Sequence, residues 1–363
     1  MPVCKHRHLD GDRSIVSIMP LLYSWTHNDF HLKTYPFQPS GLIGHDQRVS
    51  QWFLEGGLHT NLVDKFKVTT GVMQNPMTIF KAVENFVLVN GRKSFCGEFI
   101  LAPQYHTFGD RFCPKGTLNE RDVAKIVVAG IKEGERKLAE EGMPAVFKFW
   151  FGIGREVSPE EAVRLTRIML EYDPSYVLGI SLVCHEPSAP PEKFIEAFRI
   201  AKREGQRTAC HVEWVKDRKE SETDTPEKVR QNFQEDLPQL TKNLRTVIFD
   251  LEVDQIDHGF GLAENPELIK AVVDRNIVVT VCPGSLLTTH IIDDIRMLRI
   301  REMLDAGVRV CLDSDDDICM PDFYKVEQMY RDAYSRRYLD IESDLKQLAK
   351  NAESARFGNI SRL

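Results

Sequence analysis

Short β-branched or aromatic runs alternate with helical patterns along most of the chain, and this alternation constrains the fold more than any other feature. Such alternation is typical of βα units and of a parallel sheet. Eight strands that alternate with helices favour an α/β fold of the closed (β/α)8 TIM-barrel type over an open sheet. The predicted strands are Val3–His8, Ser94–Leu101, Ala145–Phe151, Tyr176–Val183, Arg207–Val212, Val253–Asp257, Ile277–Cys282 and Val308–Leu312.

Amphipathic stretches lie between most of these strands and predict the helices of the barrel. Pro159 and Pro266 begin two of them, in the first helical turn, where the missing proline N–H costs no hydrogen bond. The main predicted helices are Glu120–Glu140, Pro159–Glu171, Pro191–Glu204 and Pro266–Arg275.

The chain of 363 residues fits one barrel domain, residues 1–363, that carries insertions. Residues 11–92 are too many for a simple βα connection, so we expect a helical lid between the first two strands, with a helix near Thr78–Leu88. Residues 216–251 are predicted to be a second insertion. It begins with the charged stretch Lys216–Thr225 and continues as a helical segment, Pro226–Leu244, interrupted by Pro238.

Composition excludes several classes of partner. The formal net charge of −7 and the pI of about 5.9 argue against long nucleic acids. The sequence contains no run of eighteen apolar residues, so we expect no membrane span. Its eight cysteines form no C-x-x-C pair, and a reduced, cytoplasmic protein is therefore expected. An oligomer is possible, but the sequence does not predict its size.

Metal-binding side chains cluster at the carboxyl ends of four predicted strands, which meet at one face of a barrel. His6 and His8 are two residues apart on a strand, so both side chains point the same way. A third imidazole and a carboxylate would complete a nitrogen and oxygen ligand set suited to zinc. The strand-end groups are His6-Arg7-His8, His211, His258-Gly259 and Ser314-Asp315-Asp316.

In this order, these residues resemble the adenosine deaminase family of the amidohydrolase superfamily. The resemblance covers nearly the whole chain, and it rests on the ordered set rather than on any single motif. The matching segments are Lys5-His6-Arg7-His8-Leu9-Asp10-Gly11, Phe99 to His106, Ala209-Cys210-His211, Ile256-Asp257-His258-Gly259, Val281-Cys282-Pro283-Gly284-Ser285 and Leu312-Asp313-Ser314-Asp315-Asp316.

The resemblance implies a role for each of these side chains. One zinc ion per chain would be held by His6, His8, His211 and Asp315. His258 would orient and polarise the attacking water, with Asp315 also taking part in catalysis. Asp316 would contact that water or the purine N7, while His8 and Asp10 would line the substrate pocket. The fourth predicted strand lacks the lysine that bridges two metals in binuclear relatives, so one metal is expected.

The general acid is where the sequence departs from the family. The family pattern is His-Ala-Gly-Glu, whereas this chain has His211-Val212-Glu213-Trp214. If the strand stays extended, Glu213 shares the face of His211 and serves as the acid. If the chain turns as in the family, Trp214 points inward instead, and the sequence leaves these two alternatives open.

Cys184 is a second departure, because it stands where the family has a glycine whose amide contacts the purine N3. The leading hypothesis is zinc-dependent hydrolytic deamination of an adenine-type purine, with adenosine or deoxyadenosine as substrate. One alternative is an amidohydrolase that acts on adenine, an N6-substituted purine or another substrate. A further alternative is a catalytically impaired homologue that only binds a purine or a metal.

Overall fold

The computed structural model describes most of the chain. The described residues are 5–18, 68–93, 97–107, 117–218, 222–223, 225–319, 339 and 341–356. Most of the predicted lid falls on residues 19–67, which lie outside this set, so the lid stays a prediction. Among the described residues, no helix is both long and apolar enough to cross a lipid bilayer.

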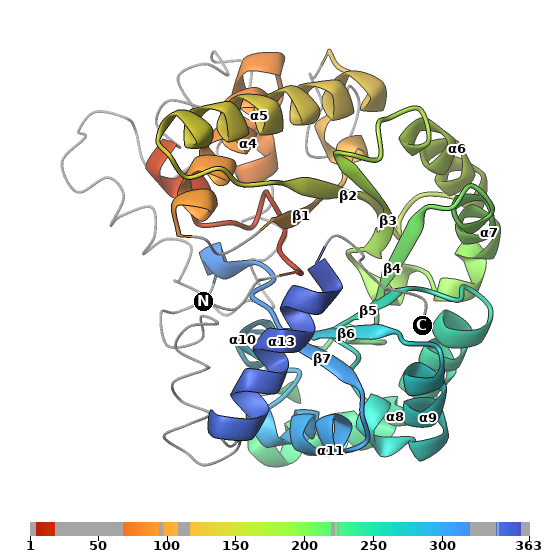
Figure 1. Cartoon of the computed structure of the whole chain (residues 1–363). Helices are drawn as coiled ribbons and strands as arrows, with labels where there is room; N and C mark the ends of the chain where they lie inside the picture. Colours follow the sequence, from red (N-terminus) through yellow and green to blue (C-terminus); the bar gives the residue numbers. More distant parts are fainter. Residues whose placement is uncertain are drawn as a thin grey trace.

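A curled parallel sheet of seven strands, in the order β1 to β7, forms the centre of the molecule (Figure 1). The strands are β1 (Glu98–Leu101), β2 (Lys148–Gly154), β3 (Val177–Val183), β4 (Arg207–His211), β5 (Gln255–Asp257), β6 (Val278–Val281) and β7 (Arg309–Leu312). All seven overlap predicted strands and follow one another as neighbours in the sheet, which confirms the predicted βα alternation.

The segment that contains His6 and His8 lies between the two edges of the curled sheet. Arg7 forms a parallel bridge with Asp315, just after β7, and His8 forms one with Ile100 on β1. The predicted first strand is therefore represented by two isolated bridges, and its first two residues lie outside the described set. A complete eight-stranded barrel stays a prediction.

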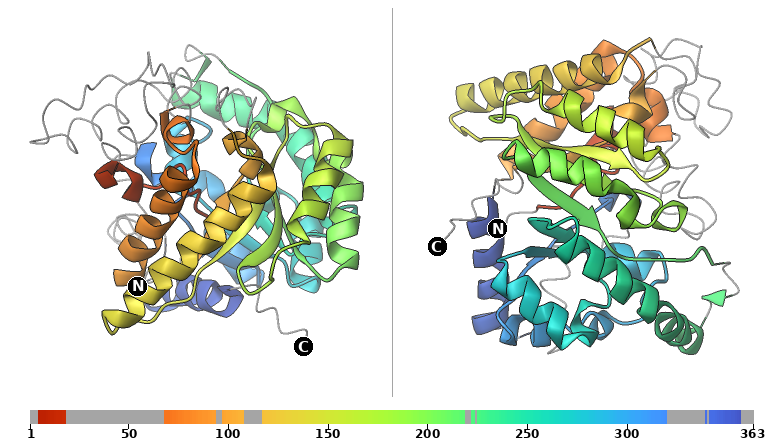
Figure 2. Two further views of the ribbon diagram at one scale, coloured as in Figure 1. Left: turned by 90° about the horizontal axis from the view of Figure 1, so that it is seen from above. Right: turned by 90° about the vertical axis from the view of Figure 1, so that its right-hand side faces the viewer.

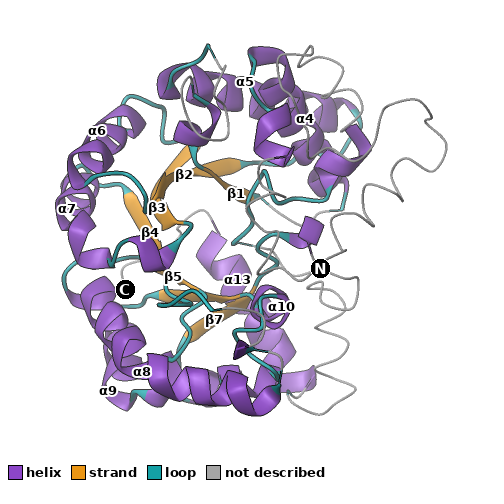
Figure 3. Cartoon of the chain, turned by 180° about the vertical axis from the view of Figure 1, so that it is seen from behind, coloured by secondary structure: helices purple, strands orange, loops and turns teal. Residues whose placement is uncertain are grey.

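Helices surround the sheet on its outer side, as Figure 3 shows from behind. The α-helices are α4 (Pro76–Arg92), α5 (Glu120–Glu140), α6 (Pro159–Met169), α7 (Ile195–Arg203), α8 (Pro226–Phe249), α9 (Pro266–Asp274), α10 (Pro283–Thr288), α11 (Ile300–Asp305) and α13 (Lys346–Ala355). Shorter 3-10 turns are η1 (Pro103–His106), η2 (Glu186–Ser188), η3 (Pro191–Phe194), η5 (Leu262–Glu264), η6 (Ile295–Leu298) and η7 (Asp317–Cys319), and η9 (Ile341–Leu345) is a π turn.

Local sequence signals explain where several helices begin. The Asn75 side chain caps α4 and the Asn119 side chain caps α5, each through a reciprocal capping box. Pro159 and Pro266 are the first residues of α6 and α9, as predicted. Helices α4 and α5 run side by side in Figure 2, and the glycines Gly130 and Gly134 of α5 allow close approach to α4.

The predicted interruption of the second insertion at Pro238 is wrong. Helix α8 continues through Pro238 to Phe249 and connects β4 to β5. An internal proline removes one backbone N–H donor and typically costs about 3 kcal/mol. Here buried apolar residues on both sides of it, among them Phe233 and Leu240, hold the helix against the core.

The described residues form three buried apolar clusters, and the two larger ones lie on opposite faces of the sheet because alternate strand residues point to opposite faces. The larger of these two lies between the sheet and the helices and includes Phe99, Phe149 and Ile256. The smaller of these two comprises Ile100, Ala102, Tyr105, Trp150, Leu178, Val183 and Ala209, with Cys184 packed against it. This second cluster lies on the inner face of the curled sheet and extends to the carboxyl ends of the strands.

A buried ion pair joins the first segment to the start of β1. The Lys5 ammonium lies 2.9 Å from the Glu98 carboxylate, and both side chains are almost fully buried. Lys5 also donates to the carbonyl of Ala355 at the end of α13, and the Trp150 indole donates to Glu98. Because every partner is buried, loss of one charge leaves the other without compensation.

We therefore expect Glu98→Leu to lower the free energy of unfolding by about 3–5 kcal/mol, measured by urea denaturation. The double variant Lys5→Met/Glu98→Leu should recover part of that loss, because no charge is left stranded. Glu171→Leu, which removes an exposed partner of Arg121, is the matched control and should leave stability nearly unchanged. A Glu98→Leu protein as stable as the control would contradict this interpretation.

Candidate metal and active site

The predicted metal-binding residues come together at the carboxyl ends of the strands. His211 ends β4, and its register partner Asp257 ends β5 immediately before His258. Asp315 follows β7, and the bridge between Arg7 and Asp315 brings the first segment beside it. These four parts of the chain thus supply one buried cluster of imidazoles and a carboxylate.

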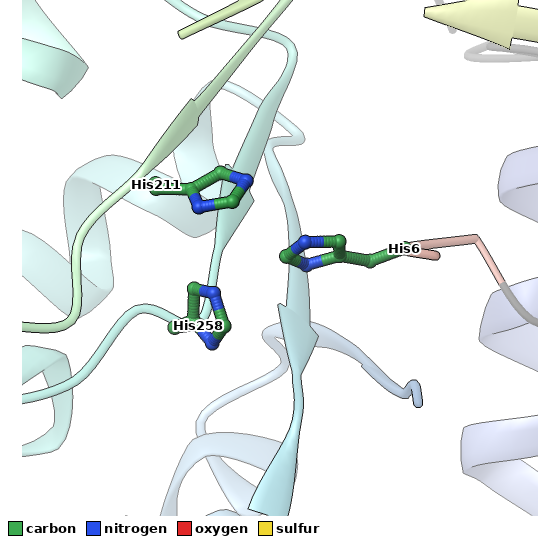
Figure 4. A group of neighbouring side chains, drawn as sticks. All are labelled: His6, His211 and His258. Atoms are coloured by element: carbon green, nitrogen blue, oxygen red, sulfur yellow. The ribbon is translucent and has the colours of Figure 1, made fainter. Parts of the chain in front are cut away.

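Four imidazole rings lie in contact. The His6 ring centroid is 4.7 Å from that of His211, 4.8 Å from that of His258 and 5.4 Å from that of His8. The rings of His211 and His258 are 5.0 Å apart. Figure 4 shows His6, His211 and His258 converging from three separate segments of the chain. Their ligand nitrogens all lie within 4.8 Å of one another, close enough to share one ion.

Asp315 supplies the carboxylate of this cluster. Its Oδ1 lies 3.4 Å from the Nε2 atoms of both His6 and His8, and its Oδ2 lies 4.0 Å from Nε2 of His258. Burial alone would raise the pKa of Asp315, but the adjacent imidazoles of His6, His258 and His8 lower it. An ionised Asp315 is therefore favoured, as metal ligation requires.

Burial keeps the imidazoles of His6, His211 and His258 neutral, which is the form that binds a metal. Burial lowers the pKa of His6 and His211, and it lowers the pKa of His258 to about 4. These rings are therefore neutral near pH 7. The Nε2 atom of His211 and both ring nitrogens of His258 are buried without a hydrogen-bond partner. Because unpaired buried nitrogens are costly, Nε2 of His211 fits a cation that accepts its lone pair, and the nitrogens of His258 fit polar partners beside that cation. Three imidazoles with one carboxylate suit zinc.

Residues behind His6 hold its ring in the orientation that ligation needs. The Thr280 hydroxyl lies 3.3 Å from Nδ1 of His6 and donates to Asp257 at 2.6 Å. Since its proton is committed to Asp257, the hydroxyl oxygen is left to accept from Nδ1 of His6. That arrangement leaves the lone pair on Nε2, which faces His8 and Asp315, and it matches the usual support of metal-bound histidines.

Three residues at the site adopt the left-handed backbone conformation, which is uncommon outside glycine. The φ angles are 68° for Cys184, 64° for His258 and 54° for Asp315. Such strain persists only where surrounding contacts enforce it, and it clusters at functional sites. Cys184 thus keeps a conformation natural to the glycine of the family pattern, although it carries a side chain.

Asp10, Asp316 and Cys184 form one wall beside the metal ligands. Burial raises the pKa of Asp316 well above its usual value, with Asp315 and Asp10 adding to the effect. Burial also raises the pKa of the Cys184 thiol, so it stays protonated. A Cβ atom at Gly11 would overlap the Asp316 carboxylate, which explains a glycine there. The substrate contacts expected of Asp10 and Asp316 stay predictions.

Arg7 has a role that the sequence analysis did not identify. Its guanidinium donates to Ser314, Asp12 and Asn90 at 2.8, 2.8 and 2.9 Å. It therefore joins the first segment to the residue before Asp315 and to helix α4. The sequence did contain a signal for this role. A residue between His6 and His8 on a strand points away from both histidines and from the metal site.

Glu213 points towards the imidazoles. Its Oε2 lies 3.6 Å from Nε2 of His258, and its Oε1 lies 4.0 Å from Nδ1 of His211. Trp214 is instead packed edge-on against His185, with the ring centroids 5.6 Å apart. Burial raises the pKa of Glu213 well above its usual value, and the nearby Asp315 and Glu186 raise it further. A protonated carboxyl at this place can donate a proton.

Two other histidines at strand ends lie outside the cluster. Nδ1 of His106 contacts the carbonyl oxygen of Met73 at 2.9 Å, and Nε2 of His185 contacts Asp217 at 3.0 Å. Neither belongs to the groups of described residues that could share an ion. His185 is partly exposed, which makes it a useful control for the buried histidines.

Comparison with known proteins places the fold and the motifs in one class. The adenosine deaminase family profile matches residues 240–360. An adenine deaminase of Rhodospirillum rubrum is 27% identical over 252 residues, covering 69% of this chain and 67% of that protein. An uncharacterized deaminase of Schizosaccharomyces pombe is 34% identical over 175 residues, covering 48% of this chain and 44% of that protein. The chain thus spans less than half of the latter relative.

Solved structures agree on the fold. An adenine deaminase from Arthrobacter aurescens has a TM-score of 0.68 at 18% identity, with 98% of this chain and 93% of that chain covered. An amidohydrolase from Burkholderia ambifaria with bound zinc gives a TM-score of 0.70 at 22% identity, with 98% and 85% covered. The Arabidopsis N6-mAMP deaminase gives a TM-score of 0.69 at 16% identity, with 98% and 93% covered.

The fold of this chain matches that of solved amidohydrolases and adenine deaminases, and its curated relatives include adenine deaminases. The match of residues 240–360 to the adenosine deaminase family model confirms the resemblance seen in the sequence.

We expect the metal site to depend on the buried imidazoles and not on the exposed one. His211→Ala should lower the zinc content, measured by inductively coupled plasma mass spectrometry after dialysis, severalfold below one ion per chain. His185→Ala should retain the wild-type content. A His211→Ala protein that keeps its zinc, or equal losses in the two variants, would contradict the assignment.

Proposed function

We propose that this protein catalyses the zinc-dependent hydrolytic deamination of an adenine-type purine. The observation that carries the proposal is the position of Glu213, whose carboxyl lies within 4.0 Å of two imidazoles of the cluster. A metal-ligand set alone would fit many hydrolases. A buried acid beside the ligand set supplies the proton donor that deamination of a purine also needs.

His6, His8, His211 and Asp315 would hold the zinc ion. When bound, zinc supplies Lewis acidity, which makes water a competent nucleophile near neutral pH. The neutral imidazoles of His6 and His211 and the ionised carboxylate of Asp315 fit that ion without any change of protonation. The crystal structure of the Burkholderia amidohydrolase, which has a related fold, contains bound zinc, and this agrees with the choice of metal.

Glu213 would act on the purine ring. Its proton, transferred to N1, makes C6 electrophilic, so that water adds there. His258 accepts a proton from the attacking water and returns one to the departing amino group. The products are ammonia and the 6-oxopurine, which keeps the proton on N1, and Glu213 is reprotonated by the proton that the new C6 hydroxyl loses. A general acid in this role typically contributes about 10²–10⁴ in rate.

Adenosine or deoxyadenosine is the leading substrate. Asp10 supports a nucleoside, because it lies in the pocket wall at the position that contacts ribose in the adenosine deaminases it resembles. Asp316, its neighbour in that wall, is placed to bond the purine N7. The inward orientation of Glu213 favours a working enzyme over a homologue that only binds a purine.

Adenine or an N6-substituted purine is the second candidate. Several relatives are named adenine deaminases, and one structural neighbour is named an N6-mAMP deaminase. Within this chain, Cys184 adds a side chain where the family has glycine, beside Tyr105. Because that side chain takes space where the family has none, it argues against strict specificity for adenosine.

The purified, zinc-loaded protein should release ammonia from at least one of adenosine, deoxyadenosine and adenine, or methylamine from N6-methyladenine, with a fall in the adenine absorbance band. Removal of the metal with a chelator should abolish turnover, and added zinc should restore it. The compound that the protein deaminates most efficiently distinguishes the nucleoside candidate from the free-base or N6-substituted candidate. If none of the four compounds yields ammonia or methylamine, the proposed function fails.

Glu213→Gln should lower kcat by about 10²–10⁴ while the zinc content stays at the wild-type level, because the variant keeps the shape of the acid but loses its proton. Trp214→Phe is the matched control from the next position and should change kcat by no more than a few-fold. Steady-state kinetics with the preferred purine tests both. Equal effects of the two substitutions would remove Glu213 from the role of acid.

A further inference from the structure

The backbone that carries Glu213 leaves the sheet directly after β4. Val212 is the last residue with a strand-like pairing: its N–H donates to the carbonyl of Asp257 at 2.9 Å, and its own carbonyl accepts from Phe260 at 3.0 Å. The next two amide groups, those of Glu213 and Trp214, have left the sheet. Buried amides need acceptors, so another group must hold this turn.

One oxygen of Glu186 accepts both amides. The N–H of Glu213 donates to Oε2 of Glu186 at 2.8 Å, and the N–H of Trp214 donates to the same atom at 3.1 Å. Glu186 begins η2, after β3, and is buried. Two consecutive amides that donate to one buried oxygen can set the direction of the chain.

The other oxygen of Glu186 is held from α8. The Asn243 side chain donates to Oε1 at 3.0 Å, and its own carbonyl oxygen accepts from Gln239 at 2.7 Å. Arg155 supports the same turn by donating to the carbonyl of His211 at 2.6 Å. With Oε1 bound to Asn243, Glu186 has a fixed orientation, and Oε2 stays directed at the two amides.

This arrangement decides which side chain enters the site. While both amides point to Glu186, the Glu213 carboxyl lies beside His211 and His258, and Trp214 lies against His185. A turn of the opposite sense would direct the indole inward and the carboxyl outward. The choice between these two alternatives is therefore made by contacts from β3 and α8 and not by the residues around Glu213.

We propose that Glu186 is a positioning residue for the reaction: by accepting the amides of Glu213 and Trp214, it aims the Glu213 acid at the substrate. The inference rests on the proposed role of Glu213 as the acid. Asn243 acts with Glu186 by fixing its rotamer. Glu186 itself touches neither the substrate nor the metal ligands' ring nitrogens.

A double-mutant cycle separates positioning from general support of the fold. Glu186→Gln keeps the shape of the side chain but loses its charge, and it sets an amide donor against the donor of Asn243. We expect kcat to fall about tenfold or more, with KM changed less than about threefold and the zinc content unchanged. In a Glu213→Gln background, the same substitution should change kcat by less than about twofold, because the group it aims is already lost.

Glu192→Gln is the matched control. Glu192 joins the same two parts of the chain, because it lies on η3 and pairs with Lys242 of α8 at 2.9 Å, but it does not contact the turn after β4. This variant should leave kcat at the wild-type level in both backgrounds. If Glu186→Gln lowers kcat by the same factor with and without Glu213, Glu186 is only structural and the inference is overturned.

Hydrogen exchange tests the clamp without any turnover. In metal-free wild-type protein, we expect the amides of Glu213 and Trp214 to exchange slowly, and in Glu186→Gln we expect them to exchange about tenfold faster or more, as read by mass spectrometry of the peptide that contains them. Unchanged exchange would overturn the inference. Slow exchange in a protein that deaminates no purine would instead place the failure in the proposed function.

Discussion

Imidazole nitrogens buried without hydrogen-bond partners are the feature on which the rest of this structure depends. A ring nitrogen hidden from water and left unpaired is costly, and His211 and His258 carry three such atoms between them. A cation bound to His211, with water and substrate beside His258, removes that cost. Asp315, ionised beside the rings, adds the charge that makes a divalent cation favourable at the same point. The cluster is thus a ligand set more than a structural core.

The scaffold brings this cluster together from segments far apart in the chain. Along the four residues Lys5 to His8, side chains that anchor the segment alternate with side chains that face the cluster. Lys5 is anchored to Glu98 and Arg7 is anchored beside Asp315, while His6 and His8 face the cluster. Because two buried cations hold the backbone on either side of His6, the histidines have little freedom to move. The segment fixes the ligands as firmly as a regular strand would.

The periodicity of the sequence was enough to predict most elements of the fold, and the order of polar residues at strand ends predicted the cluster. Helix α5 has the bounds expected from its pattern, Glu120–Glu140, because its apolar spacing and its Asn119 cap are both local signals. Helix α8 was predicted less well. Its continuation through Pro238 depends on packing against the core, which no local signal carries.

The orientation of Glu213 could not be read from the sequence for a similar reason. Its decisive contact, with Glu186, reaches back 27 residues, and Asn243 lies 57 residues beyond Glu186. A local pattern leaves both senses of the turn open, and only the packing of three elements chooses between them. The same reasoning applies to Arg7, whose partners lie on α4 and after β7. Sequence patterns therefore predicted which residues meet in the cluster, whereas the groups that hold them in place needed the structure.

X-ray absorption spectroscopy of the zinc-loaded protein tests the central claim most directly, because it reports the atoms bound to the ion. The account predicts nitrogen and oxygen ligands only, with imidazole scattering and bond lengths of about 2.0–2.2 Å. Cys282 provides the contrast, since its sulfur lies 3.5 Å from Nδ1 of His6. A sulfur ligand at about 2.3 Å, or a spectrum without imidazole scattering, would contradict the account.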